Sequence, residues 1–523
     1  MTSYSLPVFG EGRVGSFPRQ GHAVSPHPTS LRQGYALCTL PVFGCRMHTS
    51  QLPRARRTDS LGRLLIRGGS GDNRIWAGAV WRPPPGKRGA AFHAALVKRP
   101  CSCIRRLAGR RAQEVRFTRL LRNHSVTADE MVRHAATGTA GRVAGRDIVV
   151  AQDTSELALG GRRARASGYG PVGKGGALGG LLLHAALALE VGTGALLGLV
   201  DAKIWNRDEG EVGPRRRRAT ADKESRRWLD ATARASEVLA TANSVTAVSD
   251  RESDIYEHFA YRPSNVHLIV RACQNRKIKT NPEDSGALLF PFIDGLPEAG
   301  RFSAKIPAAP GRKERTAELA VRFSPVRLCK PQNGAARDLP DTMALMLVDV
   351  REVSTPEDGE PIHWRLLTTH TVTSLGEARK IVDLYRMRWT IEEFFRLLKT
   401  AGFDIEDADI GDPQVMIKLV AAVTVAAVTV MQLVKARDGT TDQKLADAFE
   451  TADQPILEAA SAQLEGSTAP QKNPHPKGSL AFAAWVIARL GGWTGYYGKP
   501  GPKVMRRGLD DFQRIKYGTT LRL

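Results

Sequence analysis

Two aspartates end predicted strands, a position from which a carboxylate can take part in chemistry. Asp153 follows the buried stretch DIVVAQ, and Asp250 follows the stretch VTAVS. A carboxylate just past the carboxyl end of a parallel strand projects into the crevice where open α/β sheets bind their ligands. A single aspartate at a strand end also serves as a turn former or a helix cap. The two residues therefore indicate a functional site only in combination with further acidic residues.

A third acidic residue, Glu392, lies in the segment YRMRWTIEEFFRLLK, together with Tyr385, Arg388 and Lys399. Successive members of this set are three, four and seven residues apart, so on one helix they fall within about 60° of one another. Polar residues on one stripe usually form a solvated face, but aromatic residues and leucines flank this stripe. A glutamate between an arginine and a lysine is expected to stay ionised, and the two basic groups can bind phosphate oxygens.

Three carboxylates beside basic groups are what phosphoryl transfer on DNA requires. The two-metal route to phosphodiester cleavage uses divalent cations about 3.5–4 Å apart, one activating the nucleophile and one stabilising the leaving oxygen. Hard oxygen ligands suit Mg²⁺ or Mn²⁺. One bridging carboxylate and one more for each ion form the smallest set that holds both, so three acidic residues are enough.

The hydrophobic pattern predicts the elements that must position these residues. Short buried strands are expected at 147–151, 245–248 and 266–270. A hairpin is expected over 178–205, turning at Gly192-Thr193-Gly194, and a helix over 220–240.

Later in the chain, residues 274–362 change to alternating patterns with many turn residues, which predicts a β-rich insertion. Ser374 and Glu377 then form a capping box that opens a long helix. We therefore expect an α/β fold with a β-rich insertion in its core and helical regions at both ends. The expected regions are an irregular basic leader at 1–110, a helical region at 111–146, two core parts at 147–273 and 363–438, the insertion at 274–362, and a helical C-terminal region at 439–523.

The charge balance favours a polyanionic partner. The 523 residues include 76 Lys and Arg against 53 Asp and Glu, a formal charge of +23, and nucleic acid is the commonest polyanion. Residues 1–110 hold 18 basic and 3 acidic residues, a net of +15, which leaves 58 against 50, a net of +8, for the rest. A run of four arginines in a predicted loop is either a solvated surface or a contact to the DNA backbone: Arg215, Arg216, Arg217 and Arg218.

The leader at 1–110 has few features of a folded domain. Proline, glycine and arginine are scattered through it without a period, and even the arginine-rich stretch 104–122 shows no clean helical face. The leader is either a basic arm or a non-native stretch that comes from an upstream start or a shifted reading frame.

Cysteine content and hydropathy exclude several classes of protein. Six cysteines in 523 residues exclude a disulfide framework. The longest apolar stretch, Leu419–Val434, has 16 residues and is shorter than the ~20 needed to cross a bilayer, so a buried core helix is favoured. The first residues lack the basic-then-apolar order of a signal peptide. We expect a cytoplasmic, nucleoid-associated protein without a membrane segment.

The segment YRMRWTIEEFFRLLK resembles the Tyr-(2)-Arg-(3)-Glu-(6)-Lys signature of the IS-four group of bacterial insertion-sequence DDE transposases. AQDTSEL around Asp153 and SDRESDIYEH around Asp250 resemble the first and second acidic motifs of that group, in the same order. KESRRWL, HWRLLTTH and KGSLAFAAWVIARLGG are also similar to segments of the group. The resemblance covers roughly residues 117–492.

This resemblance implies an RNase H-like mixed sheet core that a β-rich insertion interrupts. It implies that Asp153, Asp250 and Glu392 form a catalytic triad that holds two Mg²⁺ or Mn²⁺ ions. Residues 111–146 would be a remnant of the helical domain with which such proteins bind transposon ends.

The resemblance also implies DNA contacts. Tyr385, Arg388 and Lys399 would contact phosphates of the transposon end. In this group, excision passes through a hairpinned end with one base flipped out and stacked on tryptophan. Trp364 is the candidate for this stacking and Trp389 would support it, although packing in the core is the alternative for each.

We therefore expect a DNA transposase that cleaves transposon ends through a hairpin intermediate and joins them to target DNA. Its partners would be the double-stranded DNA of the terminal inverted repeats, target DNA, and a second copy in a synaptic homodimer formed through 439–523. Two alternatives stay open: an RNase H-fold nuclease without strand transfer, and a degenerate transposase copy that binds DNA without transposing.

Overall fold

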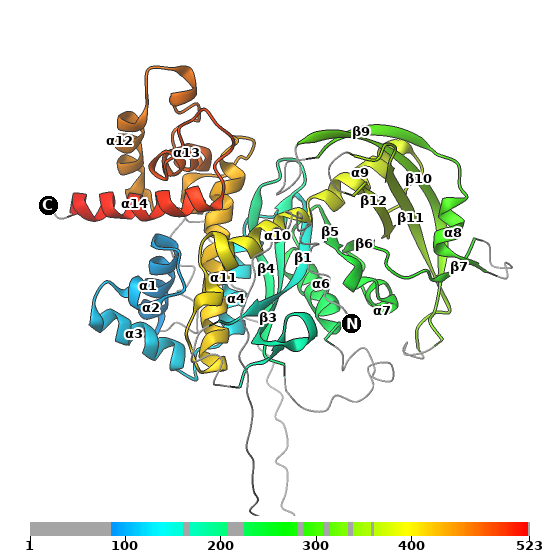
Figure 1. Cartoon of the computed structure of the whole chain (residues 1–523), viewed down its shortest axis with the longest axis horizontal. Coiled ribbons are helices and arrows are strands. Elements are labelled where there is room, and N and C mark those ends of the chain that lie inside the picture. Colours follow the sequence, from blue (N-terminus) through cyan, green and yellow to red (C-terminus); the bar gives the residue numbers. More distant parts are fainter. Residues whose placement is uncertain are drawn as a thin grey trace, which may run out of the picture. The chain divides into compact units, whose positions relative to one another are not determined.

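The structure is a computed structural model, and it describes residues 85–160, 168–207, 224–280, 286–306, 314–332, 338–356 and 360–520. These residues form a mixed α/β fold in which one large sheet lies between helices (Figure 1). This arrangement is consistent with the RNase H-like fold that the sequence predicts.

The described strands form one sheet in the order β2-β3-β1-β5-β6-β12-β11-β10-β7-β8, with β4 paired to β3 and β9 paired to β10. Among the described strands, only the neighbours β1, β5 and β6 run parallel. The strands are β1 Asp147–Ala158, β2 Gly170–Val172, β3 Leu178–Glu190, β4 Leu196–Trp205, β5 Ser244–Ser249, β6 His267–Arg271, β7 Lys277–Lys279, β8 Ala287–Leu288, β9 Gly300–Ile306, β10 Arg315–Cys329, β11 Thr342–Glu352 and β12 His363–Thr368.

Helices precede the sheet, cover its faces and follow it in the chain. The described α-helices are α1 Pro85–Lys98, α2 Ile104–Ala108, α3 Arg111–Arg122, α4 Ala128–Ala140, α6 Arg226–Val238, α7 Tyr256–Ala260, α8 Leu289–Asp294, α9 Leu375–Arg386, α10 Trp389–Arg396, α11 Pro413–Ala436, α12 Gln454–Leu464, α13 Leu480–Leu490 and α14 Pro502–Thr520. The predicted capping box of Ser374 and Glu377 is present at the start of α9, and Thr127 caps the start of α4 through its side chain.

Strand β1 separates two hydrophobic clusters, because successive side chains of a strand point to opposite faces of the sheet. Val149 and Ala151 belong to a cluster that includes residues of α10 and α11. Ile148 and Val150 belong to a second cluster with residues of α6 and α7. The strand that carries Asp153 is therefore packed on both sides, with different helices on each face.

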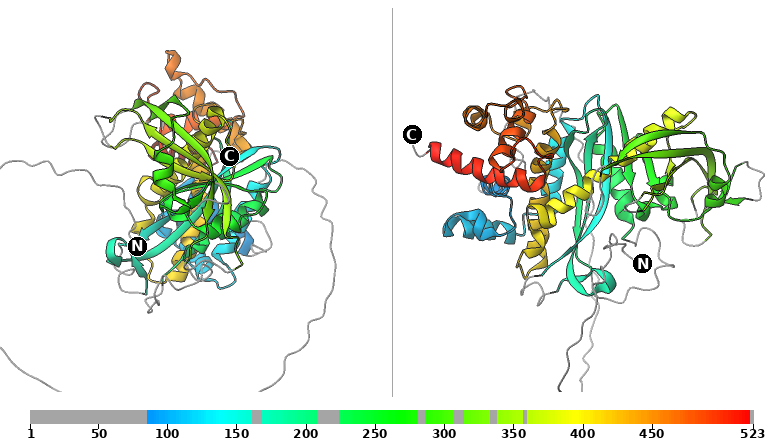
Figure 2. Two further views of the ribbon diagram at one scale, coloured as in Figure 1. Left: turned by 90° about the vertical axis from the view of Figure 1, so that its right-hand side faces the viewer. Right: turned by 45° about the horizontal axis from the view of Figure 1, so that its top comes forward.

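The predicted insertion at 274–362 is rich in strands and holds β7 to β11. These strands do not form a separate sheet. β12 pairs with β6 through Leu366↔Arg271 and with β11 through Val348↔Leu366, so the insertion extends the core sheet at one end (Figure 2). The helical regions α1 to α4 and α12 to α14 lie toward the other end of the sheet.

Helix α11 contains the long apolar stretch of the sequence. Asp412 caps its first turn through backbone N–H groups of Gln414 and Val415, and Pro413 is its first residue. By length and composition alone α11 could cross a membrane, but 89% of its most apolar window is buried inside the protein. It contacts β4, α1, α4, α13 and α14, which is typical of the core helix of a globular protein.

The structure differs from the predicted leader at 1–110. Residues 85–110 form α1 and α2, whereas residues before 85 lie outside the described part. Phe92 and Leu96 of α1 are buried, and Phe92 packs on Phe117 with ring centroids 4.9 Å apart. The arginine-rich stretch also forms helices, because Leu107 and Leu120 supply enough apolar surface to bury one side of each. The expected boundary at 110 therefore falls inside a packed helical region.

We expect Leu96→Ala to destabilise the protein by about 2–5 kcal/mol, because the side chain is fully buried in the cluster that α1 shares with α11. Urea unfolding of the full chain measures this loss. Lys98→Ala, on the exposed side of the same helix, is the matched control and should change stability by less than about 0.5 kcal/mol. Equal stabilities of the two variants would show that α1 does not belong to the folded unit.

Candidate active site

Asp153 lies within β1 and not at its end. The prediction of a short strand that stops at Asp153 is wrong, because antiparallel pairing with β3 continues β1 to Ala158. The parallel ladder with β5 does end early, at the pair Ala151↔Val248. Asp153 therefore stands two residues beyond the last parallel pair, at the carboxyl edge of that part of the sheet.

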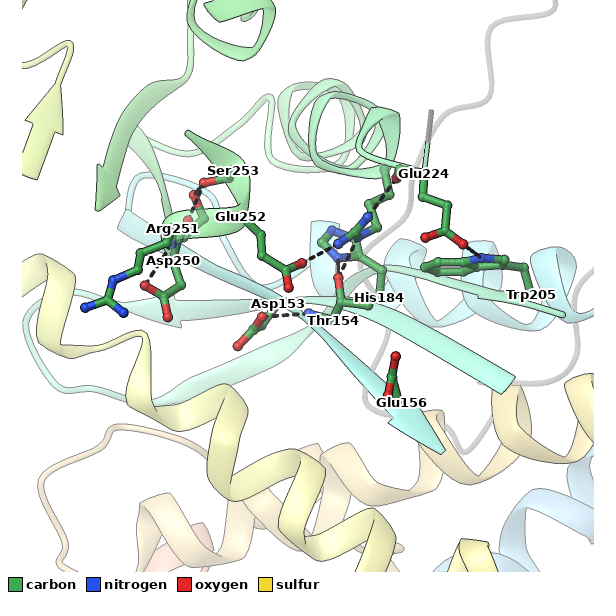
Figure 3. A network of polar contacts seen from close by, with 12 residues as sticks. Asp153, Thr154, Glu156, His184, Trp205, Glu224, Asp250, Arg251, Glu252 and Ser253 are labelled. Carbon is green, nitrogen blue, oxygen red and sulfur yellow. Dashed lines mark hydrogen bonds and ion pairs between the residues drawn. The ribbon is translucent and has the colours of Figure 1, made fainter. Parts of the chain in front are cut away.

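Asp250 follows β5 directly and caps a short 3₁₀ turn, Arg251–Ser253. Its Oδ1 accepts a hydrogen bond of 2.8 Å from the backbone N–H of Arg251. The residue is therefore a cap and at the same time the neighbour of Asp153 on the adjacent parallel strand. Figure 3 shows both carboxylates where the two strands separate.

Arg388 connects the sheet to the helix that carries Glu392. Its Nη1 donates to Asp153 Oδ2 at 3.2 Å, and its Nη2 donates to Glu392 Oε1 at 2.7 Å. The Arg388 side chain is only 7% exposed, whereas the Asp153 and Glu392 side chains retain 23% and 28% exposure. The structure thus brings together Asp153 from β1, Asp250 after β5, and Glu392 from α10.

Burial and the charges of three acidic residues around Arg388 shift the pKa values of the site. Burial raises the pKa of Asp153 to about 7; Arg388 and the Thr154 backbone oppose this rise, while the charges of Asp250 and Glu392 add to it. Burial also raises the pKa of Glu392, again against the effect of Arg388. For Arg388, burial acts to lower the pKa, but the anionic forms of its neighbours raise it above the ordinary value. Burial and the neighbouring carboxylates thus outweigh the effect of Arg388 on the pKa values of Asp153 and Glu392.

The predicted helical stripe is not one continuous α-helix. α9 ends at Arg386, α10 begins at Trp389, and a π-helical turn occupies Leu397–Ala401. Because a π-turn is wider than an α-turn, the rotation of 100° per residue assumed for the stripe does not hold over the turn that contains Lys399. Lys399 Nζ lies 3.6 Å from Glu406 Oε1, and its predicted place beside Glu392 stays a prediction.

Tyr385 and the two tryptophans differ in accessibility. Tyr385 is 4% exposed, and its ring contacts Trp364 at a centroid distance of 5.6 Å. Burial raises the pKa of Tyr385 to about 12, and Arg388 approaches its ring without forming a well-aligned hydrogen bond to the hydroxyl. Trp364 is partly buried, whereas Trp389 is 50% exposed. Of the two tryptophans, Trp389 offers the more open surface for stacking.

Arg215, Arg216, Arg217 and Arg218 lie outside the described residues, so their predicted contact to DNA stays a prediction.

The donor chemistry of the site fits a hard divalent cation. Asp153, Asp250 and Glu392 supply carboxylate oxygens, the ligands that Mg²⁺ and Mn²⁺ prefer. In the present arrangement Arg388 engages one oxygen of Asp153 and one of Glu392. Within the described residues, no group of three or more His, Cys, Asp or Glu side chains is arranged to hold a metal ion. The predicted three-carboxylate cage therefore stays a prediction.

A second set of polar residues lies behind the acidic site (Figure 3). Arg227 binds Thr154 and Glu252, and Thr154 binds His184 Nδ1 at 2.9 Å. His184 is buried, and its Nε2 has no hydrogen-bond partner among the described residues. Thr154, Arg227 and Glu252 carry no periodic or charge signal of their own. The only sign of them in the sequence is that each lies in a segment that resembles the transposase motifs.

Comparison with known families gives a match over part of the chain. Residues 207–426 match the family model described as transposase DDE domain. The matched segment contains Asp250, Arg388 and Glu392, while Asp153 precedes it in the chain and joins them through the sheet. The match supports a DDE transposase, the DNA-cleaving enzyme of insertion sequences and other mobile elements, which acts in transposition. DNA binding follows from that class.

We expect Arg388→Ala to destabilise the protein by about 3–5 kcal/mol at pH 8, because two carboxylates lose their common cation. The loss should shrink as the pH falls below 7, since protonation removes the uncompensated charge from Asp153 first. Urea unfolding at pH 5 and pH 8 measures the difference. Arg396→Ala, an exposed position on the same helix, should leave stability unchanged at both values; a pH-independent loss in Arg388→Ala would contradict the charge argument.

We expect Asp153→Asn to make the metal-free protein more stable than the wild type above pH 7. The folded-state pKa of about 7 lies above the unfolded value of about 3.9, so the stability from this group is present at low pH and disappears as the pH rises through 7. The variant should therefore show a flatter dependence of its melting temperature on pH between 4 and 7, measured in a chelating buffer. Asp230→Asn, at a partly exposed carboxylate on α6, should keep the wild-type profile.

Proposed function

We propose that this protein cleaves DNA at the ends of a mobile element and joins the freed 3′ ends to target DNA. Asp153, Asp250 and Glu392 are the proposed catalytic acids. The observation that carries the proposal is the convergence of Asp153 and Glu392 on one buried Arg388, beside Asp250 at the end of the neighbouring parallel strand. The transposase DDE domain match supports the same reaction class.

The same three carboxylates would hold two Mg²⁺ or Mn²⁺ ions, which when bound activate the attacking oxygen and stabilise the leaving oxygen. The raised pKa values of Asp153 and Glu392 support a site that gains from added positive charge. In the proposed reaction Arg388 keeps Asp153 and Glu392 oriented before substrate arrives. Such preorganisation spares the reorganisation of charged groups during the reaction.

We propose finer features by analogy with the IS-four group. The end would be cut through a hairpin intermediate, with a flipped base stacked on Trp364 or on the more exposed Trp389. Tyr385, Arg388 and Lys399 would contact phosphates of the transposon end. For Tyr385 and Arg388 this contact requires that DNA binding uncover side chains that are now buried.

The proposed partners are terminal inverted repeats, target DNA and a second copy of the chain. The synaptic homodimer would form through the helical region 439–523, and 111–146 would contribute to binding of transposon ends. The run Arg215, Arg216, Arg217 and Arg218 would contact the DNA backbone. The expected location is the cytoplasm, at the nucleoid.

Substitution of the three acids tests the proposal. Asp153→Asn, Asp250→Asn and Glu392→Gln should each abolish nicking of a plasmid that carries the DNA flanking the gene, in Mg²⁺ or Mn²⁺, and should retain binding of that DNA. Glu393→Gln is the matched control, because Glu393 is the next residue on α10 and pairs with Lys435 instead of Arg388. Wild-type cleavage in any of the three variants would remove that residue from the assignment.

The same plasmid separates the proposal from its two alternatives. Joining of cut ends to a second DNA molecule supports a transposase, and cutting without joining supports a nuclease. Binding without cutting by the wild-type protein supports a degenerate copy.

A further inference from the structure

Arg227 of α6 connects the two chain segments that carry the catalytic aspartates. Its Nε donates to Thr154 Oγ1 at 2.6 Å, and its Nη2 donates to Glu252 Oε2 at 2.5 Å. Thr154 is the residue after Asp153, and Glu252 lies two residues after Asp250. The Arg227 side chain is only 10% exposed, whereas the Glu252 side chain is 57% exposed, so the buried guanidinium reaches from Thr154 to a carboxylate at the surface.

The position of this bridge matters because backbone pairing between the two strands has already ended. The parallel ladder stops at Ala151↔Val248, so beyond it no β1–β5 hydrogen bond sets the distance between Asp153 and Asp250. The contacts of Arg227 to Thr154 and Glu252 lie beyond that point. They hold the two segments together where the sheet no longer does.

Arg227 acts from the face of the sheet opposite to the carboxylate of Asp153. Successive residues of a strand point to opposite faces, and Thr154 stands across from His184 of β3, on the side of α6. The backbone N–H of Thr154 donates to Asp153 Oδ1 at 2.7 Å. A shift of Thr154 would therefore move a donor that orients the Asp153 carboxylate.

The Thr154 hydroxyl has two hydrogen-bond partners. It accepts from Arg227 Nε at 2.6 Å and shares a second hydrogen bond of 2.9 Å with His184 Nδ1. Thr154 is thus held on both sides, by the Arg227 guanidinium and by the His184 ring.

Arg227 itself is held rigidly. Its Nη1 donates to the carbonyl of Glu224 at 2.9 Å, and its guanidinium lies 5.3 Å from the ring centroid of Trp228 and 5.9 Å from that of Trp205. On the Asp250 side, the turn that contains Glu252 is closed by the bond from Ser253 Oγ to the carbonyl of Asp250 at 2.8 Å. Fixing Glu252 therefore fixes the turn that begins at Asp250 (Figure 3).

We propose that Arg227 is a positioning residue that sets the separation of Asp153 and Asp250, and through it the affinity of the site for divalent cations. This inference rests on the proposed function, because it assumes that both aspartates hold metal. Arg227 is not a catalytic residue here, since it touches Thr154 and Glu252 and neither aspartate carboxylate. Loss of such an outer contact typically lowers metal affinity or activity by about 10- to 100-fold.

Titration with Mn²⁺ alone tests the inference, with the melting temperature of the full chain as the readout. Arg227→Gln should raise the Mn²⁺ concentration for half-maximal stabilisation by about 10- to 100-fold, and Arg227→Lys, which keeps the charge but not both contacts, should lie between it and the wild type. Arg226→Gln is the matched control, because Arg226 is more than half exposed and pairs with Asp230 in its own helix. It should titrate as the wild type does.

A second pair of variants removes the same link from the other end and avoids a change of buried charge. Thr154→Val keeps the shape of the side chain and loses both hydroxyl hydrogen bonds, so it should weaken Mn²⁺ binding in the same direction. Thr154→Ser keeps the hydroxyl and should preserve wild-type binding. A shift in Thr154→Val without one in Thr154→Ser supports positioning through this contact.

Cleavage of the plasmid that carries the flanking DNA separates failure of the inference from failure of the proposed function. The inference is overturned if the wild type cuts in Mn²⁺ and if Arg227→Gln and Thr154→Val need the same Mn²⁺ concentration as the wild type for half-maximal stabilisation. If the wild type shows no Mn²⁺-dependent cutting, the proposed function fails instead.

Discussion

The buried guanidinium of Arg388 binds two carboxylates, those of Asp153 and Glu392, which lie far apart in the chain. One is on a strand of the central sheet and the other on the helix that crosses its face, so the guanidinium connects the two layers at the site. Burial of any one of these charges alone would be unfavourable, and each is tolerated because the others are present. This shared contact adds to the apolar packing of Ile391 and Phe394, which also holds α10 against the sheet.

The acidic site also depends on the point at which β1 and β5 stop pairing. Backbone hydrogen bonds hold strands at a fixed spacing, which leaves no room for a ligand between them. Past the pair Ala151↔Val248 this constraint ends, and side chains take its place. Arg388 acts on the face of Asp153, and Arg227 acts on the opposite face. The end of the β1–β5 ladder thus leaves space for a ligand, and the two arginines hold the chain segments on either side of that space.

Several features could be predicted from the sequence because they depend on local residues. The cap at Thr127, the capping box of Ser374 and Glu377, and the hairpin of β3 and β4 each follow from a few neighbouring side chains. The burial of α11 followed from its length and composition. The acidic residues could be proposed because they end predicted strands and match a spaced motif.

Other features depend on contacts between distant segments, which the local pattern does not contain. β1 continues past Asp153 because β3 pairs with it, and the pattern after Asp153 is too polar to predict a buried strand. The π-helical turn that contains Lys399 adds one residue to a turn without a distinctive composition. Helices α1 and α2 bury few apolar residues, and their packing depends on α3 and α11. The role of Arg227 is visible only once its two partners are placed.

The central position of α11 also has a consequence for the order in which the protein can fold. Leucines of β3 and β4 belong to the same hydrophobic cluster as α11, and α1 and α4 also contact this helix. A ribosome adds about 5–20 residues per second, so the chain between Trp205 and Pro413 takes on the order of 10 s or more to synthesise. During that interval α4 can already cover part of β4, but the surface that α11 buries in the finished protein is still open. Until α11 has been synthesised, this apolar surface can bind other chains and lead to aggregation.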